Sequence, residues 1–488
     1  MWKEGDEEPA SPSARLMQAP KFNLCIISVM GYNTKIDTNL YKKCVEQTLL
    51  KHPRFASILV ANDGKCRWRR TSVDVDNHVY EVDLDPDPDA ESSDELVENY
   101  ASNLSKIPLD SAKPLWEIHI LNVETSDASA TVLFKLHHSM GDGVSLMALC
   151  HACSRSISNP DALPAYPSSK ERGRRRECRG TVMSFFVLVW TLLVISFNTL
   201  LDVALFLATI FFLEDSRTPV KAAGAGDGGG EPSRTRFVHR VVSLDDVKLV
   251  KTALNASIND VVLGVTEAGL SRYLNARYEN DRETGAEIIK SGTNSLPRNL
   301  RFRSAVVFNL RPCPTIEDLA EMMEKEELNG MWGNFIGIVI LPFTIDMQED
   351  PLTYIRRAKS SMDRKKLSLA HKCAFLVMKL TMLLFGVKAA AGMTRSVFKH
   401  TTLTFSNVMG PKEEVNLFGH HLRYIAPSVY GFPQSLVVHH QSYGEKLIIS
   451  IGADEKLIPN PHQLCDELVK SLQIIKAAAI KRELFDKF

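Results

Sequence analysis

The sequence has no excess of charge of either sign. Its 488 residues include 58 lysines and arginines against 58 aspartates and glutamates, so the formal net charge is zero. A chain with balanced charge produces no global field that would concentrate a polyanion, and any basic surface has to be local. We therefore expect no nucleic-acid partner.

The sequence also lacks the short motifs of several enzyme classes. It contains no Gly-x-Ser-x-Gly nucleophile elbow, no phosphate-binding P-loop and no dinucleotide-binding glycine fingerprint. These absences leave a covalent serine route and a bound nucleotide cofactor without motif support. The segment Met1–Pro20 is acidic and then rich in proline and serine, and it lacks the basic and apolar regions of a signal peptide.

Cysteine is present in a number and arrangement that disfavour a disulfide framework. The nine cysteines are odd in number and scattered, several of them within apolar runs. This pattern is typical of buried free thiols in a reducing compartment. Cys150 and Cys153 form a lone Cys-x-x-Cys on a predicted helix, without a second pair or a suitably spaced histidine. We therefore favour core packing over zinc binding at this pair and expect no metal.

The length and pattern of the chain predict two domains. Single hydrophobic cores stop growing at roughly 250–300 residues, so 488 residues exceed one core. Apolar runs such as Phe22–Met30 predict buried strands, and Asp37–Lys51 predicts a helix that Pro53 ends. Strands and helices that alternate in this way indicate a layered α/β sandwich.

The composition divides the chain into three parts. Residues 1–165 and 236–488 have globular patterning, whereas residues 166–235 do not. The middle part contains a basic cluster at 170–179, an apolar segment at Val182–Leu213 and a glycine-rich stretch at Ala222–Gly230. We expect the glycine-rich stretch to be a flexible linker between the two domains.

One string in the first domain carries chemistry. It runs Phe134-Lys-Leu-His137-His138-Ser-Met-Gly-Asp142-Gly143. Strand alternation places His138 on the apolar face of the strand and His137 on the opposite face. A neutral imidazole there can take a proton from an alcohol, whose oxygen then attacks a thioester carbonyl. Asp142 either caps the following helix or pairs with a basic side chain, and the glycines permit a turn that a side chain would obstruct.

A structural reading of this string is two histidines at a strand end followed by a glycine turn. The sequence offers a comparison, because His420-His421 and His439-His440 are also pairs. Neither of these pairs is followed by the Asp-Gly turn. The complete string is therefore more informative than a histidine pair, and it favours a catalytic His138.

His-His-x-x-x-Asp-Gly resembles the signature of the acyl-CoA-dependent acyltransferase superfamily, which includes chloramphenicol acetyltransferase and peptide-synthetase condensation domains. Further strings resemble one branch of it, the wax ester synthase/diacylglycerol acyltransferases, over nearly the whole chain and in the expected order, and Ser11-Pro12 and His52–Phe55 resemble the plant-type members of this branch. The further strings are Pro114–Glu117, Ser257–Asp260, Asn309–Arg311, Gly333–Asn334 through Gly337 to Pro342, and Asn407–Pro411.

The resemblance implies an α/β fold of two chloramphenicol-acetyltransferase-like sandwich domains with the active site at their interface. It implies that His138 is the general base and that His137 is less critical. It also implies that Asp142 and Gly143 are mainly structural. Acyl-CoA is the implied co-substrate, a fatty alcohol or diacylglycerol is the implied acceptor, and no bound cofactor is expected.

The family's Asn-Asp motif falls on Asn259 and Asp260. Ser257 and Asp260 also have the spacing of a helix capping box, and an acid in the first turn suits the helix dipole. Capping and catalytic support therefore both remain open for Asp260. For Asn259 we favour a site role, in which its amide steadies the oxyanion or the substrate.

The apolar segment predicts a membrane-associated insertion. Val182–Leu201 has 20 residues without a formal charge, enough for a helix to span a hydrocarbon core of roughly 30 Å. The preceding basic cluster predicts a cytosolic flank, and the resemblance implies the endoplasmic reticulum membrane with cytosol-facing domains. A buried core helix is the alternative.

A single crossing would place His138 and Asn259 on opposite sides of the membrane. The segment can avoid this by returning through a bend near Asn198 and Asp202, by lying along the interface, or by packing on the enzyme as a lipid-facing lid. We expect a hairpin or an interfacial segment. A second apolar stretch, Leu367–Met393, is interrupted by lysines and predicts helices that cover a sheet, with a membrane-facing role as the alternative.

Two other functions remain open. The first is an acyltransferase of the same superfamily with a soluble alcohol or phenol as acceptor, which the apolar segment disfavours. The second is a non-catalytic lipid-binding membrane protein that retains the fold, which the complete His-His-x-x-x-Asp-Gly string disfavours.

Overall fold

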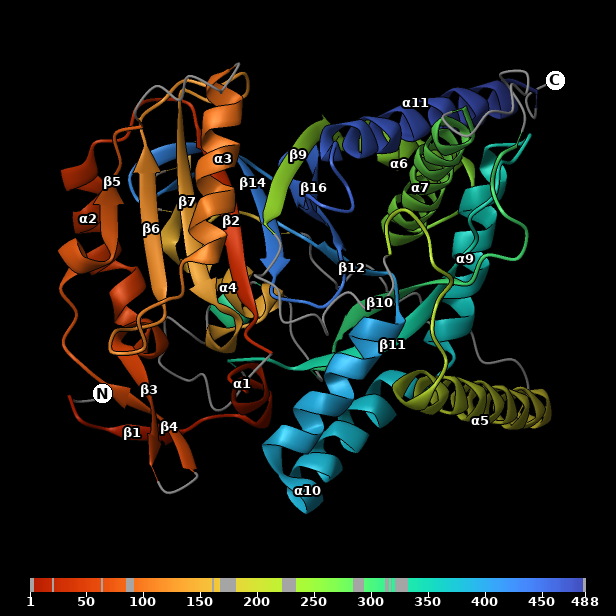
Figure 1. Ribbon diagram of the computed structural model, residues 1–488, viewed down its shortest axis with the longest axis horizontal. Helices are drawn as coiled ribbons and strands as arrows, with labels where there is room; N and C mark the ends of the chain where they lie inside the picture. The colour runs from red at the N-terminus through yellow and green to blue at the C-terminus, as the bar shows by residue number, and fades with distance from the viewer. Residues whose placement is uncertain are drawn as a thin grey trace.

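The structure is a computed structural model with two sheet-based halves packed against each other (Figure 1). It describes residues 4–19, 22–62, 65–84, 92–159, 162–166, 181–221, 234–283, 294–311, 316, 318–320 and 332–485. The predicted basic cluster at 170–179 and the glycine-rich stretch at 222–230 lie outside the described residues.

The first half is built on a seven-stranded sheet of order β5-β6-β7-β2-β14-β13-β8. Its strands are β2 (Cys25–Tyr32), β5 (Val79–Glu81), β6 (Trp116–Leu121), β7 (Ala130–His137), β8 (Ser154–Ser156), β13 (Val415–Leu417) and β14 (His420–Tyr430). The helices of this half are α1 (Pro12–Met17), α2 (Thr38–Gln47), α3 (Ser93–Lys106) and α4 (Gly143–Cys153). A small sheet of order β1-β4-β3 completes it, with β1 (Glu7–Pro9), β3 (Ser57–Asn62) and β4 (Lys65–Arg70).

The second half is built on a six-stranded sheet of order β11-β10-β12-β15-β16-β9. Its strands are β9 (Thr235–Ser243), β10 (Phe302–Asn309), β11 (Ile336–Phe343), β12 (Leu403–Val408), β15 (Leu436–Tyr443) and β16 (Lys446–Asp454). Its helices are α5 (Thr181–Phe211), α6 (Leu244–Ala253), α7 (Ile258–Glu283), α9 (Leu352–Lys366), α10 (Ala370–His400) and α11 (Pro461–Phe485). Single-turn 3₁₀ helices lie at Leu49–Lys51, Pro53–Ala56, Val75–Asn77 and His138–Met140.

The C-terminal part of the chain contributes two strands, β13 and β14, to the sheet of the first half, which the division at residue 236 does not anticipate. β14 pairs antiparallel with β2, with Tyr430 opposite Cys25, so a segment of the C-terminal half completes the N-terminal sheet. The predicted domains 1–165 and 236–488 therefore follow the order of the chain, but the first sheet contains strands from both of them. This pairing fixes the halves in one arrangement, because separating them would break the ladder between β14 and β2.

Each half has its own hydrophobic core. In the first core, Tyr41 and Val45 of α2 and Ala101 of α3 pack with sheet residues such as Ile27. In the second core, side chains of α6, α7, α9 and α11 pack against the six-stranded sheet. Two cores of this kind agree with the limit that surface-to-volume scaling places on one core.

The apolar segment forms one unbroken helix, so the predicted hairpin at Asn198 and Asp202 is wrong. α5 spans 31 residues, and neither residue lies at a bend. Instead, both face the protein: Nδ2 of Asn198 donates to the carbonyl of Leu367 at 3.1 Å, and Asp202 lies 2.8 Å from Nζ of Lys365. Lys365 of α9 neutralises the Asp202 carboxylate, so no bend in α5 is required to keep this charge out of an apolar environment.

The second apolar stretch covers a sheet and also faces outward. α10 packs on β11, where Ala374, Val397 and Ile340 share a buried cluster. The helix is interrupted at Gly386, which has φ 82° and ψ 173°, and the side chains just before this glycine are exposed. α5 and α10 are both long and apolar enough to cross a membrane.

Candidate active site

His138 lies where the last strand residue of β7 gives way to a short helical turn. Its backbone N–H donates to the carbonyl of Leu24 at 2.8 Å, which fixes the end of β7 beside β2. Its side chain lines a cavity of about 1210 Å³ together with Phe134 and Leu136 from the same face of β7. The alternation along β7 thus places the imidazole at the end of an apolar strand face.

A residue of the other half holds the His138 ring. Nδ1 of His138 lies 3.0 Å from Oδ1 of Asn334, and Nδ2 of Asn334 donates to the His138 carbonyl at 2.8 Å. Because an amide oxygen only accepts, this pairing assigns the ring proton to Nδ1 and leaves the lone pair on Nε2. Burial lowers the pKa of His138, so the ring is neutral at physiological pH.

His137 points away from the cavity and performs a structural task. Its Nε2 lies 2.8 Å from Oδ1 of Asn23, and its Nδ1 lies 2.6 Å from Oγ of Ser139. Burial lowers the pKa of His137 to about 4, so this ring is also neutral. It ties the segment that precedes β2 to the turn that carries His138.

Asp142 both caps α4 and pairs with a basic side chain, the two alternatives that the sequence left open. Its Oδ1 accepts from the N–H of Ser145 at 3.0 Å. Arg311 of the second half binds both carboxylate oxygens, at 2.9 and 3.0 Å, and Phe335 N–H donates to the carboxylate at 2.9 Å. The side chains of Asp142 and Arg311 are 2% and 0% exposed. The pair is a buried bidentate contact between the halves.

The two glycines of the string allow close approach rather than an unusual backbone conformation. Gly141 has an extended backbone, with φ 173° and ψ 160°, and neither glycine is in the left-handed region. A Cβ on Gly141 would lie 3.3 Å from the ring of Trp332, and a Cβ on Gly143 would lie 3.2 Å from Cγ2 of Val408. Each glycine therefore lets a residue of the second half pack directly against the turn.

Asn259 and Asp260 have different surroundings. Asp260 is 1% exposed and forms a reciprocal capping box, in which its Oδ2 accepts from Ser257 N–H at 2.7 Å and Ser257 Oγ accepts from Asp260 N–H at 3.2 Å. Asn259 lines the cavity, and its Oδ1 accepts a hydrogen bond from Asn407. The structure thus brings Asn259, but not Asp260, to the cavity that contains His138.

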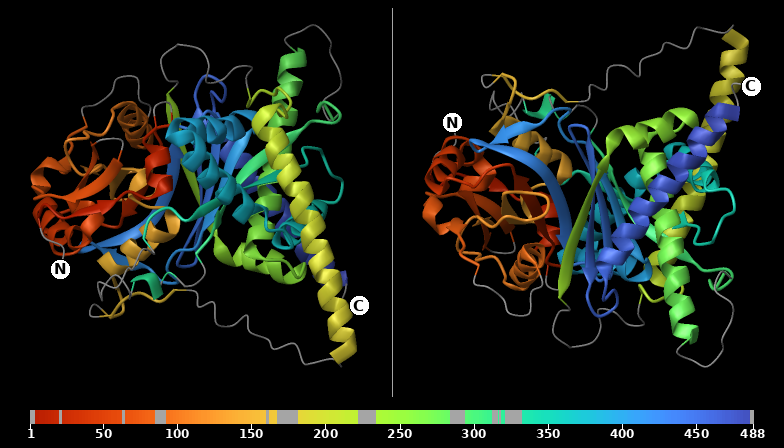
Figure 2. Two further views of the ribbon diagram at one scale, coloured as in Figure 1. Left: turned by 90° about the horizontal axis from the view of Figure 1, so that it is seen from below. Right: turned by 90° about the horizontal axis from the view of Figure 1, so that it is seen from above.

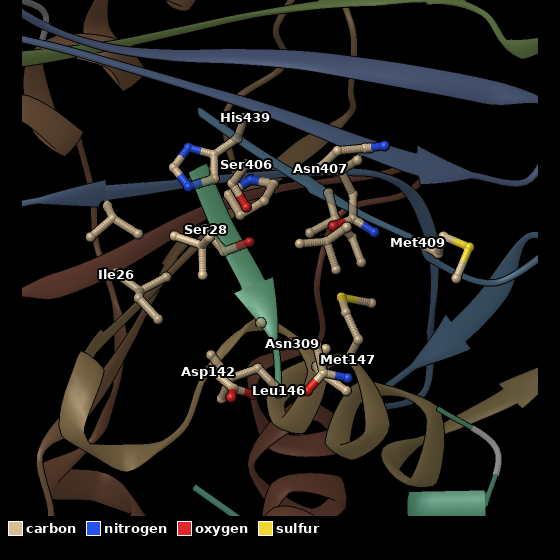
Figure 3. A pocket seen from close by; sticks show the side chains of 18 of the residues that line it. Ile26, Ser28, Asp142, Leu146, Met147, Asn309, Ser406, Asn407, Met409 and His439 are labelled. Atoms are coloured by element: carbon tan, nitrogen blue, oxygen red, sulfur yellow. The ribbon is translucent and has the colours of Figure 1, made fainter. Parts of the chain in front are cut away.

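The sequence did not single out three residues that the structure places at the site. Asn334 and Arg311 stood within strings of the resemblance, but nothing in their spacing identified their partners in the first half. His439 lines the cavity from β15, 6% exposed, and Figure 3 shows it beside Ser406 and across the cavity from Asp142. Burial lowers the pKa of His439 to about 4.

Solved structures show which class of fold this is. The wax ester synthase/diacylglycerol acyltransferase from Marinobacter aquaeolei VT8 superposes with a TM-score of 0.59 at 16% identity, covering 97% of this chain and 100% of that chain. The first condensation domain of the calcium-dependent antibiotic synthetase, in complex with a substrate analogue, gives 0.55 at 11% identity over 98% and 97%. The fold is that of chloramphenicol-acetyltransferase-like, condensation-type enzymes.

Sequence comparison identifies the family. Residues 34–262 match the wax ester synthase/diacylglycerol acyltransferase catalytic domain, and residues 332–476 match the WS/DGAT C-terminal domain. Wax ester synthase/diacylglycerol acyltransferase 11 of Arabidopsis thaliana is 46% identical over 99% of this chain and 97% of its own length. Number 5 of the same plant is 42% identical over 98% and 95%. The chain belongs to the wax ester synthase/diacylglycerol acyltransferase family of O-acyltransferases.

Proposed function

We propose that His138 is the general base that activates the hydroxyl of a long-chain alcohol or a diacylglycerol for attack on acyl-CoA. One observation carries this proposal: a neutral imidazole, with Nδ1 bonded to Asn334, lines a cavity that both halves of the enzyme form. A buried base of lowered pKa keeps its lone pair at physiological pH and is ready to accept a proton.

In the proposed reaction, Nε2 of His138 takes the hydroxyl proton as the alcohol oxygen bonds to the thioester carbonyl carbon. The carbonyl oxygen becomes an oxyanion, the carbon–sulfur bond then breaks, and the proton on His138 passes to the departing CoA thiolate. Asn259 is a candidate donor to the oxyanion, because its Oδ1 accepts from Asn407 and its Nδ2 makes no hydrogen bond to another described residue.

The cavity carries lysines where α6 borders it, which suits the phosphates of CoA. Lys248 and Lys251 of α6 and Lys412 contribute to the lining, as do the acidic Asp318 and Glu445. Lysine is a common phosphate ligand because it presents a point charge on a flexible stem. We propose that acyl-CoA enters where α6 borders the cavity, with its thioester directed toward His138.

Replacing Lys248, Lys251 and Lys412 together with alanine is expected to raise the KM for acyl-CoA by about tenfold, since charge-assisted contacts are worth roughly 1.5–3 kcal/mol before surface screening reduces them. The kcat should stay within about twofold, because the three lysines are assigned to the phosphates of CoA and not to the reacting hydroxyl or carbonyl. Steady-state kinetics at low and high salt would measure this. The matched control replaces Lys106, Lys456 and Lys470, which are exposed and line no part of the cavity. Equal KM values in both triple variants would contradict the assignment.

Another part of the cavity is apolar, which suits a lipid acceptor. It is lined by Leu16 and Met17 of α1, Phe22, and Met378 and Phe398 of α10. A long alkyl chain gains about 0.8 kcal/mol per methylene on leaving water for such surroundings. This lining supports the proposal of a lipid acceptor.

An acceptor panel tests the proposed function. Labelled acyl-CoA is supplied with a long-chain fatty alcohol, a diacylglycerol or a soluble phenol, and the ester products are separated. We expect wax ester, triacylglycerol or both, and little phenyl ester. A dominant phenyl ester would favour a soluble acceptor, and the absence of all three products would favour a lipid-binding protein without turnover.

We further propose that α5 lies along the membrane surface and that both halves face the cytosol, at the endoplasmic reticulum. A single crossing would separate residues 4–166 from 234–485, yet His138 and Asn334 are in hydrogen-bond contact. The exposed face of α5 is apolar, with Phe197 and Leu200 68% and 71% exposed. The seven described cysteines are free, which suits the reducing cytosolic side.

A further inference from the structure

α10 is a helical hairpin rather than one long helix. Oγ1 of Thr381 lies 3.6 Å from Sδ of Met393, although twelve residues separate them. In a continuous helix this separation would amount to about 18 Å along the axis. Gly386 makes the reversal possible, because its φ of 82° lies in a region that side chains disfavour. Figure 1 shows the two arms running side by side to a tip at the bottom of the molecule.

The tip of the hairpin is apolar and unpartnered among the described residues. Leu383, Leu384 and Phe385 are 78%, 69% and 72% exposed. Lys379 and Lys388 are also exposed, one on each arm next to the tip. A protruding apolar tip with a lysine on each side is suited to insertion into a bilayer. The apolar side chains would reach the acyl chains, and the ammonium groups would stay at the level of the lipid phosphates. A groove for a partner protein would instead be concave.

α5 and the hairpin form one surface. The N–H of Leu369 donates to Oγ1 of Thr199 at 2.9 Å, and Asn198 bonds Leu367, so α5 is fastened to the start of the hairpin. Seen from below, both lie on the same side of the molecule, and α5 extends beyond the rest of it (Figure 2, left). A membrane that contacts the exposed face of α5 therefore also meets the hairpin tip.

The inner face of the same hairpin lines the apolar part of the cavity. Met378 on the first arm and Thr394 and Phe398 on the second arm contribute to the lining, as do Leu16 and Met17 of α1. Phe398 packs against Phe22, with ring centroids 6.0 Å apart. One element thus presents its tip to the outside and its inner face to the space that leads to His138.

We propose that the α10 hairpin inserts its tip into the bilayer and that the acceptor lipid passes from the bilayer to His138 between α1 and the hairpin. This inference rests on the proposed function. A lipid on this path exchanges one apolar environment for another, so its alkyl chain is not exposed to water on the way. The same path returns an apolar ester product to the membrane.

The test compares two acceptors in one enzyme. The triple variant Leu383→Ser, Leu384→Ser, Phe385→Ser is assayed with a long-chain alcohol held in vesicles of phosphatidylcholine and phosphatidylserine, and with a short-chain alcohol dissolved in water. We expect kcat/KM for the vesicle-held alcohol to fall about tenfold and that for the dissolved alcohol to stay unchanged. α5 retains its own apolar face, so flotation should still recover the variant with the vesicles.

A second variant probes the path itself. Thr394→Trp places a large ring between α1 and the hairpin without changing the tip. It should lower kcat/KM for the vesicle-held alcohol about tenfold while vesicle flotation stays at the wild-type level. The control replaces the exposed apolar residues Ile107, Ile157 and Ile480 with serine and should match the wild type in every assay.

The outcomes separate the two proposals. A ratio of the two kcat/KM values that stays at the wild-type level in both variants would overturn the hairpin route, even if both activities fell together. A wild-type enzyme that esterifies neither alcohol would overturn the proposed function, and with it this inference.

Discussion

Replacing His138 with alanine is expected to lower kcat for ester formation by about 10²–10⁴-fold, the range that a positioned general base contributes. The KM for acyl-CoA should change little, because the imidazole acts on the hydroxyl proton and not on the phosphates of CoA. The variant should remain folded, since Asn334 is the residue that the His138 side chain hydrogen-bonds within the described part of the chain, and its amide also bonds the backbone carbonyl at residue 138. Labelled acyl-CoA turnover and a thermal unfolding curve measure both expectations.

The pH profile gives this prediction a second readout. Burial lowers the pKa of His138 below the ordinary histidine value of 6.5. The base form is the neutral ring, so kcat/KM should be level around neutrality and should fall only as the pH drops through the lowered pKa. The residual activity of His138→Ala should lack this acidic limb.

His137→Ala is the matched control, because it removes a neighbouring imidazole that bonds Asn23 and Ser139 instead of lining the cavity. Its loss should appear as reduced stability, with a smaller reduction in kcat than at position 138. Wild-type turnover in His138→Ala, or an equal loss of kcat at both positions with intact folding, would remove the proposed base.

Those features of the fold and site that depend on neighbouring residues could be predicted from the sequence. Period-two alternation along residues 130–138 predicted that His138 and His137 face opposite sides of the strand. Of these two histidines, the structure places His138 in the cavity lining. The capping spacing of Ser257 and Asp260 predicted a local contact that the structure contains. Each of these features depends on residues a few positions apart, whose geometry secondary structure fixes.

The remaining features depend on contacts that span the chain. Asn334 lies 196 residues from His138, and Arg311 lies 169 from Asp142, so no periodicity connects them. The prediction of a bend at Asp202 failed because its carboxylate pairs with Arg364 and Lys365, which lie more than 160 residues away. The placement of β14 in the first sheet likewise depends on pairing with β2. Composition and local spacing carry no information about such partners.

Breaking the Asp142–Arg311 pair is expected to have the largest effect on stability. Arg311→Met leaves a buried carboxylate whose remaining donors, among the described residues, are the backbone N–H groups of Ser145 and Phe335. Removing one partner of a buried ion pair typically costs about 3–5 kcal/mol, because the other charge stays desolvated. Arg311→Lys should recover only part of this, since an ammonium group cannot reproduce the bidentate contact.

The interface supplies its own probe for this experiment. Nε1 of Trp332 donates to the carbonyl of Met140 at 2.8 Å, so its fluorescence should report separation of the two halves in a urea titration. The control is Arg356→Met, which breaks an ion pair with Asp350 whose side chains are 48% and 49% exposed. Exposed pairs contribute about 0–1 kcal/mol, so its midpoint should hardly move. A midpoint for Arg311→Met equal to that of this control would contradict the assignment.

Turnover should fall together with stability in Arg311→Met, because Arg311 also holds the segment that orients His138. Arg311 also donates to the carbonyl of Gly333 at 2.8 Å, and the next residue is Asn334, which orients the His138 ring. The Asp142–Arg311 pair therefore holds Gly333 and Asn334 against the first half, and Asn334 selects the tautomer of His138.

Combining Arg311→Met with Asp142→Asn removes both charges and should cost less stability than the sum of the single changes, because neither ion is then buried alone. In this double variant stability should recover more than kcat, since Asn334 still lacks the anchor beside it.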